Sequence, residues 1–217
     1  MADIFQEVDE EVRREQLKKL WERNQNLIIA VAILIILGVS GWRGYEYWQT
    51  KKAAEAGAAF ENAVTLSEQG KHEEAEAAFA KLGADSTATY QGLAQVRAAA
   101  ELAQTDPKGA IAAYDKIAAD SAIPAVLRNL AGLHAGALMV DKGSFADVRT
   151  RLEPLTGSDQ IFHHTARELL ALAAWRAGDT TAARQWIDMI TADPDTPADE
   201  RSRVQMLDAL MASADKG

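Results

Sequence analysis

Residues 70–82, GKHEEAEAAFAKL, hold the pattern that decides the fold, because it recurs three more times along the chain. A turn residue is followed five positions later by a small apolar residue, then by a large apolar residue four positions on, and by another apolar residue three positions after that. The four triplets are Ala75, Phe79 and Leu82; Ala110, Tyr114 and Ile117; Val148, Leu152 and Leu155; and Ala183, Ile187 and Ile190. Their leading positions are 35, 38 and 35 residues apart. A period of this length indicates a repeat protein.

A further small residue lies twelve positions before each triplet, on the helix that is expected to precede it. These residues are Ala63, Ala98, Gly136 and Ala171. The whole pattern resembles the tetratricopeptide repeat, a helical hairpin of about 34 residues. The Trp and Tyr usual in the first helix of that repeat, and its closing Pro, are absent. The resemblance implies an α-solenoid of about four hairpins, in which the small residues let paired helices approach closely.

Glycines, prolines and capping residues divide this part of the chain into helices. We expect helices over 51–69, 71–82, 88–104, 107–119, 124–141, 144–154, 159–177, 179–192 and 197–214. Gly70, Gly143 and Gly178 are expected to end helices in the left-handed conformation. Asp106 and Thr196 are each followed by a proline, and we expect them to be N-caps.

The last of these helices is expected to cap the solenoid. Val204, Leu207 and Met211 recur at a helical spacing that places them on one face, toward the core. In this helix we expect three residues to face water: Asp199, Glu200 and Arg201.

Composition excludes several classes of protein. The 217 residues include 43 alanines and few β-branched residues after the first fifty, which favours helices over a β-sandwich or barrel. The chain has no cysteine, and this excludes a disulfide scaffold, a cysteine zinc site and thiol catalysis. Its net charge of −9 argues against nucleic acid as a partner, because phosphate binding needs a basic surface.

A candidate transmembrane helix precedes the repeats. Residues 24–42 contain no charged side chain, and 27–37 are an unbroken aliphatic block. Nineteen helical residues span roughly 28 Å, the thickness of the hydrocarbon core of a bilayer. Aromatic residues and arginines flank the block on both sides, which is typical of a span and not of a buried core helix. A cleaved signal peptide would have a long, acidic first region here, so we expect an uncleaved anchor.

Basic residues beside the span predict its orientation. Five lie on the N-terminal side (Arg13, Arg14, Lys18, Lys19 and Arg23) and three on the other side (Arg43, Lys51 and Lys52). The positive-inside rule then leaves the N-terminus in the cytoplasm and exports the rest. We therefore expect a cytoplasmic segment (1–23), a transmembrane helix (24–42), a juxtamembrane aromatic segment (43–50) and a periplasmic helical domain (51–217). The expected fold class is all-α: one transmembrane helix, then the tetratricopeptide-like solenoid and its cap.

A search for chemistry yields no catalytic, cofactor-binding or metal-binding residue. His163 and His164, with Asp159 just before them, are the one cluster worth weighing. Neighbouring side chains on a helix point about 100° apart, so we expect that the two imidazoles cannot share a metal ion. Isolated histidines (His72 and His134) and the acidic run of Glu73, Glu74 and Glu76 are more simply structural or solvated. We expect no cofactor and no small-molecule substrate.

Four stretches carry a second resemblance: Gly41-Trp42-Arg43, residues 60–64 (FENAV), residues 89–94 (TYQGLA) and the hairpin from Gly178 to Trp186. In order and spacing the chain resembles the ancillary SecYEG translocon subunit family, bitopic inner-membrane proteins of Gram-negative bacteria. The resemblance implies a non-enzymatic scaffold whose partners are the SecYEG translocon and periplasmic chaperones. Two alternatives stay open: a general envelope scaffold, serving outer-membrane protein assembly or cell division, and an enzyme or sensor.

Overall fold

The computed structural model describes residues 2–85 and 88–214, with side chains for all of these except 2–13, 15–17, 19, 20, 28, 85, 88 and 89. Every regular element among the described residues is helical, as the sequence predicts. Helix α1 runs from Ala2 to Glu68. The chain divides into two compact units, Met1–Glu55 and Ala56–Gly217.

The first unit consists of α1 up to Glu55. From Trp21 onward this helix is long and apolar enough to cross a membrane. The described aliphatic side chains between Leu27 and Val39 are all about half exposed or more, on every side of the helix. Lys52 places its ammonium group 4.0 Å from the ring centre of Trp48, at the end of the aromatic segment. No proline occurs before Pro107, and the isolated glycines do not interrupt the helix.

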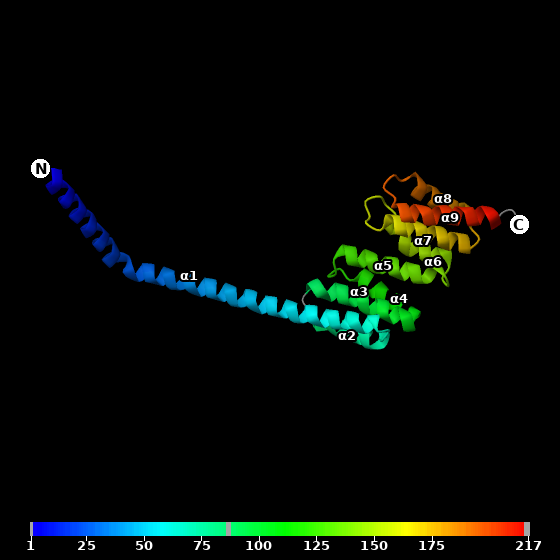
Figure 1. Cartoon of the computed structure of the whole chain (residues 1–217), viewed down its shortest axis with the longest axis horizontal. Coiled ribbons are helices and arrows are strands. Elements are labelled where there is room, and N and C mark those ends of the chain that lie inside the picture. Colours follow the sequence, from blue (N-terminus) through cyan, green and yellow to red (C-terminus); the bar gives the residue numbers. More distant parts are fainter. Residues whose placement is uncertain (1, 86–87, 215–217) are drawn as a thin grey trace. The chain divides into compact units, whose positions relative to one another are not determined.

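The second unit stacks helices in chain order, as Figure 1 shows for α2 to α9. The last turns of α1 pair with α2 (His72–Asp85), and the next hairpins follow. They are α3 (Ala88–Thr105) with α4 (Pro107–Ala119), α5 (Ala125–Val140) with α6 (Phe145–Leu152) and the 3₁₀ helix η1 (Glu153–Leu155), and α7 (His163–Arg176) with α8 (Thr180–Ala192). Helix α9 (Ala198–Ala214) closes the stack. First helices also contact one another, α3 with α5, α5 with α7, and α7 with α9. This two-layer arrangement is a helical solenoid, as predicted.

The predicted repeat register is confirmed by burial. All twelve triplet residues are buried. The small residues of the preceding helices are buried as well (Ala63, Ala98, Gly136 and Ala171). At Gly136 a methyl group would lie 2.7 Å from Cγ of Leu152, closer than van der Waals contact allows. The small residue is therefore required for α5 and α6 to approach this closely.

Phe79 shows how the large residue of a triplet holds neighbouring helices together. Its side chain is 1 % exposed and packs in one core cluster with Ala63 of α1, Ala75 of α2 and Ala98 of α3. The ring meets that of Phe60 edge-on, with the ring centres 5.2 Å apart. The first hairpin and the start of the second thus share one apolar core.

The helix C-termini follow the prediction at two of three glycines. Gly70 and Gly178 adopt φ angles of 73° and 80°, which L side chains rarely adopt. Gly143 does not have a positive φ, so its predicted left-handed conformation is wrong. Its N–H donates to the Met139 carbonyl at 2.7 Å, and the following Ser144 caps α6 by accepting from the Asp147 N–H. The tight turn is thus made by ordinary backbone angles.

One of the two predicted N-caps is confirmed. Asp106 is the N-cap residue of α4 and Pro107 begins the helix, although the Asp106 side chain makes no capping hydrogen bond. The Thr196 hydroxyl donates to the Ile190 carbonyl at 2.7 Å, and α9 begins only at Ala198. Thr196 closes the loop between α8 and α9 and does not cap α9.

The sequence predicts that Glu200 lies on the side of α9 that faces water, but its side chain is buried. It lies four residues before Val204, so it continues the buried stripe of the helix by one turn. Its Oε1 has no hydrogen-bond partner within the described residues. Burial, and then the neighbouring charge of Glu168, raise the pKa of Glu200. The neutral carboxyl group is the form that this site favours.

Phe79→Ala should lower the free energy of unfolding of the 51–217 fragment by about 3–5 kcal/mol, because it empties a buried aromatic site. Urea unfolding followed by circular dichroism measures the change. Met206→Ala is the control. Met206 is 66 % exposed, so this substitution should lower the free energy of unfolding far less than Phe79→Ala does. A loss below about 1 kcal/mol at Phe79 would contradict the repeat register.

Glu200→Gln should stabilise the same fragment at neutral pH. The folded-state pKa of Glu200 lies above its unfolded value, so the cost of ionising it develops as the pH rises and is absent in acid. The gain in melting temperature should therefore shrink toward pH 4; each 1 kcal/mol corresponds to about 2–4 °C for a domain of this size. Glu61→Gln, at an exposed position of α1, is the matched control. An equal gain in melting temperature at neutral pH and at pH 4 would contradict a raised pKa of Glu200.

Candidate functional site

A groove opens along the second helices of the first two hairpins. It has a volume of about 780 Å³, and residues of α2, α3 and α4 line it. Ala98 and Ala99 of α3 are buried there, whereas Glu76 of α2 and Lys116 of α4 are partly or fully exposed. Most of the other lining residues are alanine or glycine, so the backbones are accessible to a bound chain. The groove therefore offers an apolar floor with charged groups of both signs around it.

A comparable space of about 470 Å³ lies between α6 and α8. Phe145, Trp186 and Met189 supply its large apolar side chains. Between α4 and α6, in contrast, Arg151 donates two hydrogen bonds to Asp115, at 3.2 and 2.8 Å. Second helices of consecutive hairpins are thus separated by a groove in two places and joined by an ion pair in the third.

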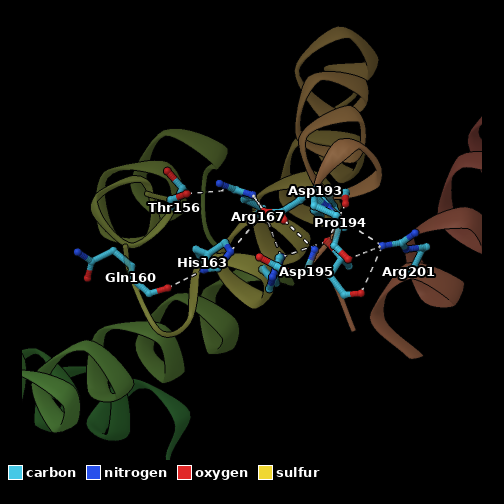
Figure 2. Close-up of polar contacts among 11 residues, drawn as sticks. Thr156, Gln160, His163, Arg167, Asp193, Pro194, Asp195 and Arg201 are labelled. Carbon is cyan, nitrogen blue, oxygen red and sulfur yellow. Dashed lines mark hydrogen bonds and ion pairs between the residues drawn. The ribbon is translucent and has the colours of Figure 1, made fainter. Parts of the chain in front are cut away.

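A polar cluster joins the start of α7 to the loop after α8 (Figure 2). The Nε2 atom of His163 is 3.5 Å from Oδ2 of Asp193, and Nδ1 of His164 is 4.0 Å from the same oxygen. The buried Arg167 donates to this oxygen at 3.1 Å and to the Thr156 carbonyl at 3.0 Å. One carboxylate oxygen therefore faces two imidazoles and one guanidinium group.

The surroundings fix the charge of this cluster. The backbone N–H of Asp195 donates to Asp193, and this bond, followed by that from Arg167, lowers the pKa of Asp193. Burial, and then the neighbouring ring of His163, lower the pKa of His164. Asp193 is therefore kept ionised, and His164 is kept neutral at neutral pH.

The expected divergence of the two imidazoles is wrong. The ring centres of His163 and His164 are only 3.8 Å apart. Helix α7 begins at His163 and not at residue 159, so no preceding helical turn restricts this side chain, and both rings turn toward Asp193. Asp159 is not a member of the cluster; it accepts from the amide of Gln160.

Sequence reasoning missed Arg167 and Asp193, which are 26 residues apart. A buried arginine in an alanine-rich helix is a signal for a distant acidic partner, because an unpaired guanidinium is costly to bury. The acidic loop DPDT at 193–196 offers that partner. Only the fold shows which of its carboxylates is used.

The other histidines and glutamates considered in the sequence analysis have contacts or positions that are typical of structural residues. His72 lies 2.7 Å from Glu101, whose second oxygen accepts from the Ser67 hydroxyl at 2.6 Å. The ring of His134 stacks on that of Tyr114, with the ring centres 5.3 Å apart. Glu73 and Glu74 occupy the first turn of α2, where the helix dipole favours acidic groups.

Comparison with known proteins identifies the family of the chain. The sequence matches the tetratricopeptide repeat-like domain over residues 18–211. No curated protein and no solved structure matches it. Domains of this kind generally mediate protein–protein interactions and are typically not enzymes. With a match over most of its length, the chain belongs to the tetratricopeptide repeat-like domain family.

Proposed function

We propose that this chain is a membrane-anchored scaffold for protein–protein interactions. One observation carries the membrane part: the described aliphatic side chains between Leu27 and Val39 are exposed on every side of α1. Such a surface is unfavourable in water and suits the interior of a bilayer. The family of the chain supports the interaction part.

The proposed location is the inner membrane of a Gram-negative bacterium, with residues 1–23 in the cytoplasm and residues 51–217 in the periplasm. Five basic residues before the span against three after it support this orientation. The absence of cysteine is compatible with an oxidising compartment. The aromatic side chains of residues 42–48 would lie at the periplasmic interface, where indole and phenol rings are favoured.

The proposed partners are the SecYEG translocon and periplasmic chaperones. This assignment depends on the resemblance of residues 41–43, 60–64 and 89–94 to the ancillary subunit family. The span and its cytoplasmic segment would contact the translocon inside the membrane. The grooves between α2 and α4 and between α6 and α8 would receive the chaperone or the emerging client. Solenoids bind partners along extended surfaces of this kind.

Deleting residues 1–42 should abolish association with SecYEG and leave a folded solenoid that still binds chaperones. Affinity isolation in mild detergent, followed by identification of the eluted proteins, compares the full chain with this truncation. Circular dichroism verifies that the truncated chain is folded. The matched control replaces residues 24–42 with an unrelated apolar span of equal length, which keeps the anchor but removes its specific contacts.

The SecYEG proposal predicts that the control chain inserts in the membrane and recovers less translocon than the natural chain does. Absence of SecYEG from the full-length eluate, while the translocon itself stays intact, would exclude the translocon as the partner. Outer-membrane assembly or division proteins in that eluate would instead identify a general envelope scaffold.

A further inference from the structure

Two imidazoles and one carboxylate converge at the start of α7. A ring nitrogen of His163, a ring nitrogen of His164 and an oxygen of Asp193 all lie within 4.8 Å of one another. These side chains are 14, 13 and 18 % exposed, so the cluster is neither fully buried nor fully open to solvent. Figure 2 shows His163 and Asp193 extending toward each other from α7 and from the loop after α8.

The hydrogen bond between His163 and the Gln160 carbonyl determines which ring nitrogen of His163 carries the proton. The other ring nitrogen faces Asp193. The Nδ1 atom of His163 is 2.6 Å from the Gln160 carbonyl oxygen, and a carbonyl only accepts, so Nδ1 carries the proton and donates it. In the neutral ring, Nε2 then directs a lone pair at Oδ2 of Asp193. Two electron-rich atoms that face each other are stabilised by a cation between them, either a proton or a metal ion.

The distance between His163 Nε2 and Asp193 Oδ2 favours the metal ion. A charged N–H···O bond joins atoms about 2.7–2.9 Å apart, whereas His163 Nε2 and Asp193 Oδ2 are 3.5 Å apart. Two ligand atoms about 2.0–2.1 Å from a tetrahedral zinc ion lie about 3.3 Å from each other. The separation of these two atoms is therefore close to that of two metal ligands.

Neighbouring groups hold the three side chains in place. The Thr196 hydroxyl oxygen lies 3.3 Å from Nδ1 of His164, which leaves Nε2 as the nitrogen of this ring that is free to bind an ion. The Gln160 carbonyl fixes the tautomer of His163, an arrangement that is common for metal-bound histidines. Arg167 and the Asp195 N–H orient the carboxylate of Asp193, and each uses one lone pair. A carboxylate has about four such positions, so a lone pair of Oδ2 stays available. The positive charge of Arg167 opposes a bound dication, and the negative charges of Asp193 and Asp195 offset it.

We propose that His163, His164 and Asp193 form a binding site for a divalent transition-metal ion of the Zn²⁺ class, with solvent completing the coordination. Imidazole nitrogen with carboxylate oxygen is a donor set that suits Zn²⁺. The ion would join the first turn of α7 to the loop between α8 and α9. This site is independent of the proposed scaffold function and of the partners named above.

The test uses the full chain in detergent micelles, without a polyhistidine tag. Zn²⁺ is titrated at neutral pH against a chromogenic chelator, and Co²⁺ in parallel, since the absorption bands of bound Co²⁺ report tetrahedral coordination. We expect one saturable site. The substitutions His163→Gln, His164→Gln and Asp193→Asn should each weaken Zn²⁺ binding by about tenfold or more. His134→Gln, at a histidine outside the cluster, should leave it unchanged.

The proposal requires that the natural chain binds Zn²⁺, and this result does not depend on whether the variants fold. No saturable Zn²⁺ or Co²⁺ binding by the folded natural chain would overturn the proposal and identify the cluster as an ion pair between Asp193 and protonated His163. Binding that survives all three substitutions would overturn it as well, because the ion would then bind elsewhere.

Discussion

The close approach of the two helices in each hairpin is the constraint on which the rest of the structure depends. At Gly136 the space for even one methyl group is already filled by Leu152. The equivalent positions hold alanine (Ala63, Ala98 and Ala171), and the large residues that face the small ones are buried. A larger residue at these positions would separate the helices and shift the next hairpin with them, since repeat proteins are stabilised chiefly by contacts between neighbours.

The solenoid also carries two grooves on its surface. They lie between second helices of consecutive hairpins, α2 and α4 in one case and α6 and α8 in the other, whereas the ion pair of Arg151 with Asp115 joins α4 to α6. The groove between α2 and α4 is lined mostly by alanine and glycine, with the longer side chains of Glu76 and Lys116 among the remaining lining residues. An interaction scaffold needs such surfaces and no catalytic group. The proposed membrane anchor would concentrate these surfaces at one membrane.

The sequence predicts the repeats well because their signal is local. The spacing of Phe79, Tyr114, Leu152 and Ile187 along their helices settles which side is buried, and all four are core residues. Glu200 was misplaced although the same periodicity, extended by one turn from Val204, would have placed it in the core. The His–Asp cluster could not be predicted in this way, because it depends on where α7 begins and on a loop 30 residues further along the chain. His163 lies at the first position of α7, where its side chain can turn toward Asp193 without a preceding helical turn beside it.

A double-mutant cycle between Gly136 and Leu152 tests the central packing claim most directly, by urea unfolding of the 51–217 fragment. In the natural background Gly136→Ala should destabilise by about 1–2 kcal/mol, because overpacking outweighs the gain in helix propensity. In the Leu152→Ala background the same change should be neutral or stabilising, since the methyl group then fills vacated space. Gly132→Ala, on the same helix with no atom nearer than 4.0 Å to the new methyl group, should stabilise in both backgrounds. Equal effects of Gly136→Ala in the two backgrounds, within about 0.5 kcal/mol, would contradict the claim.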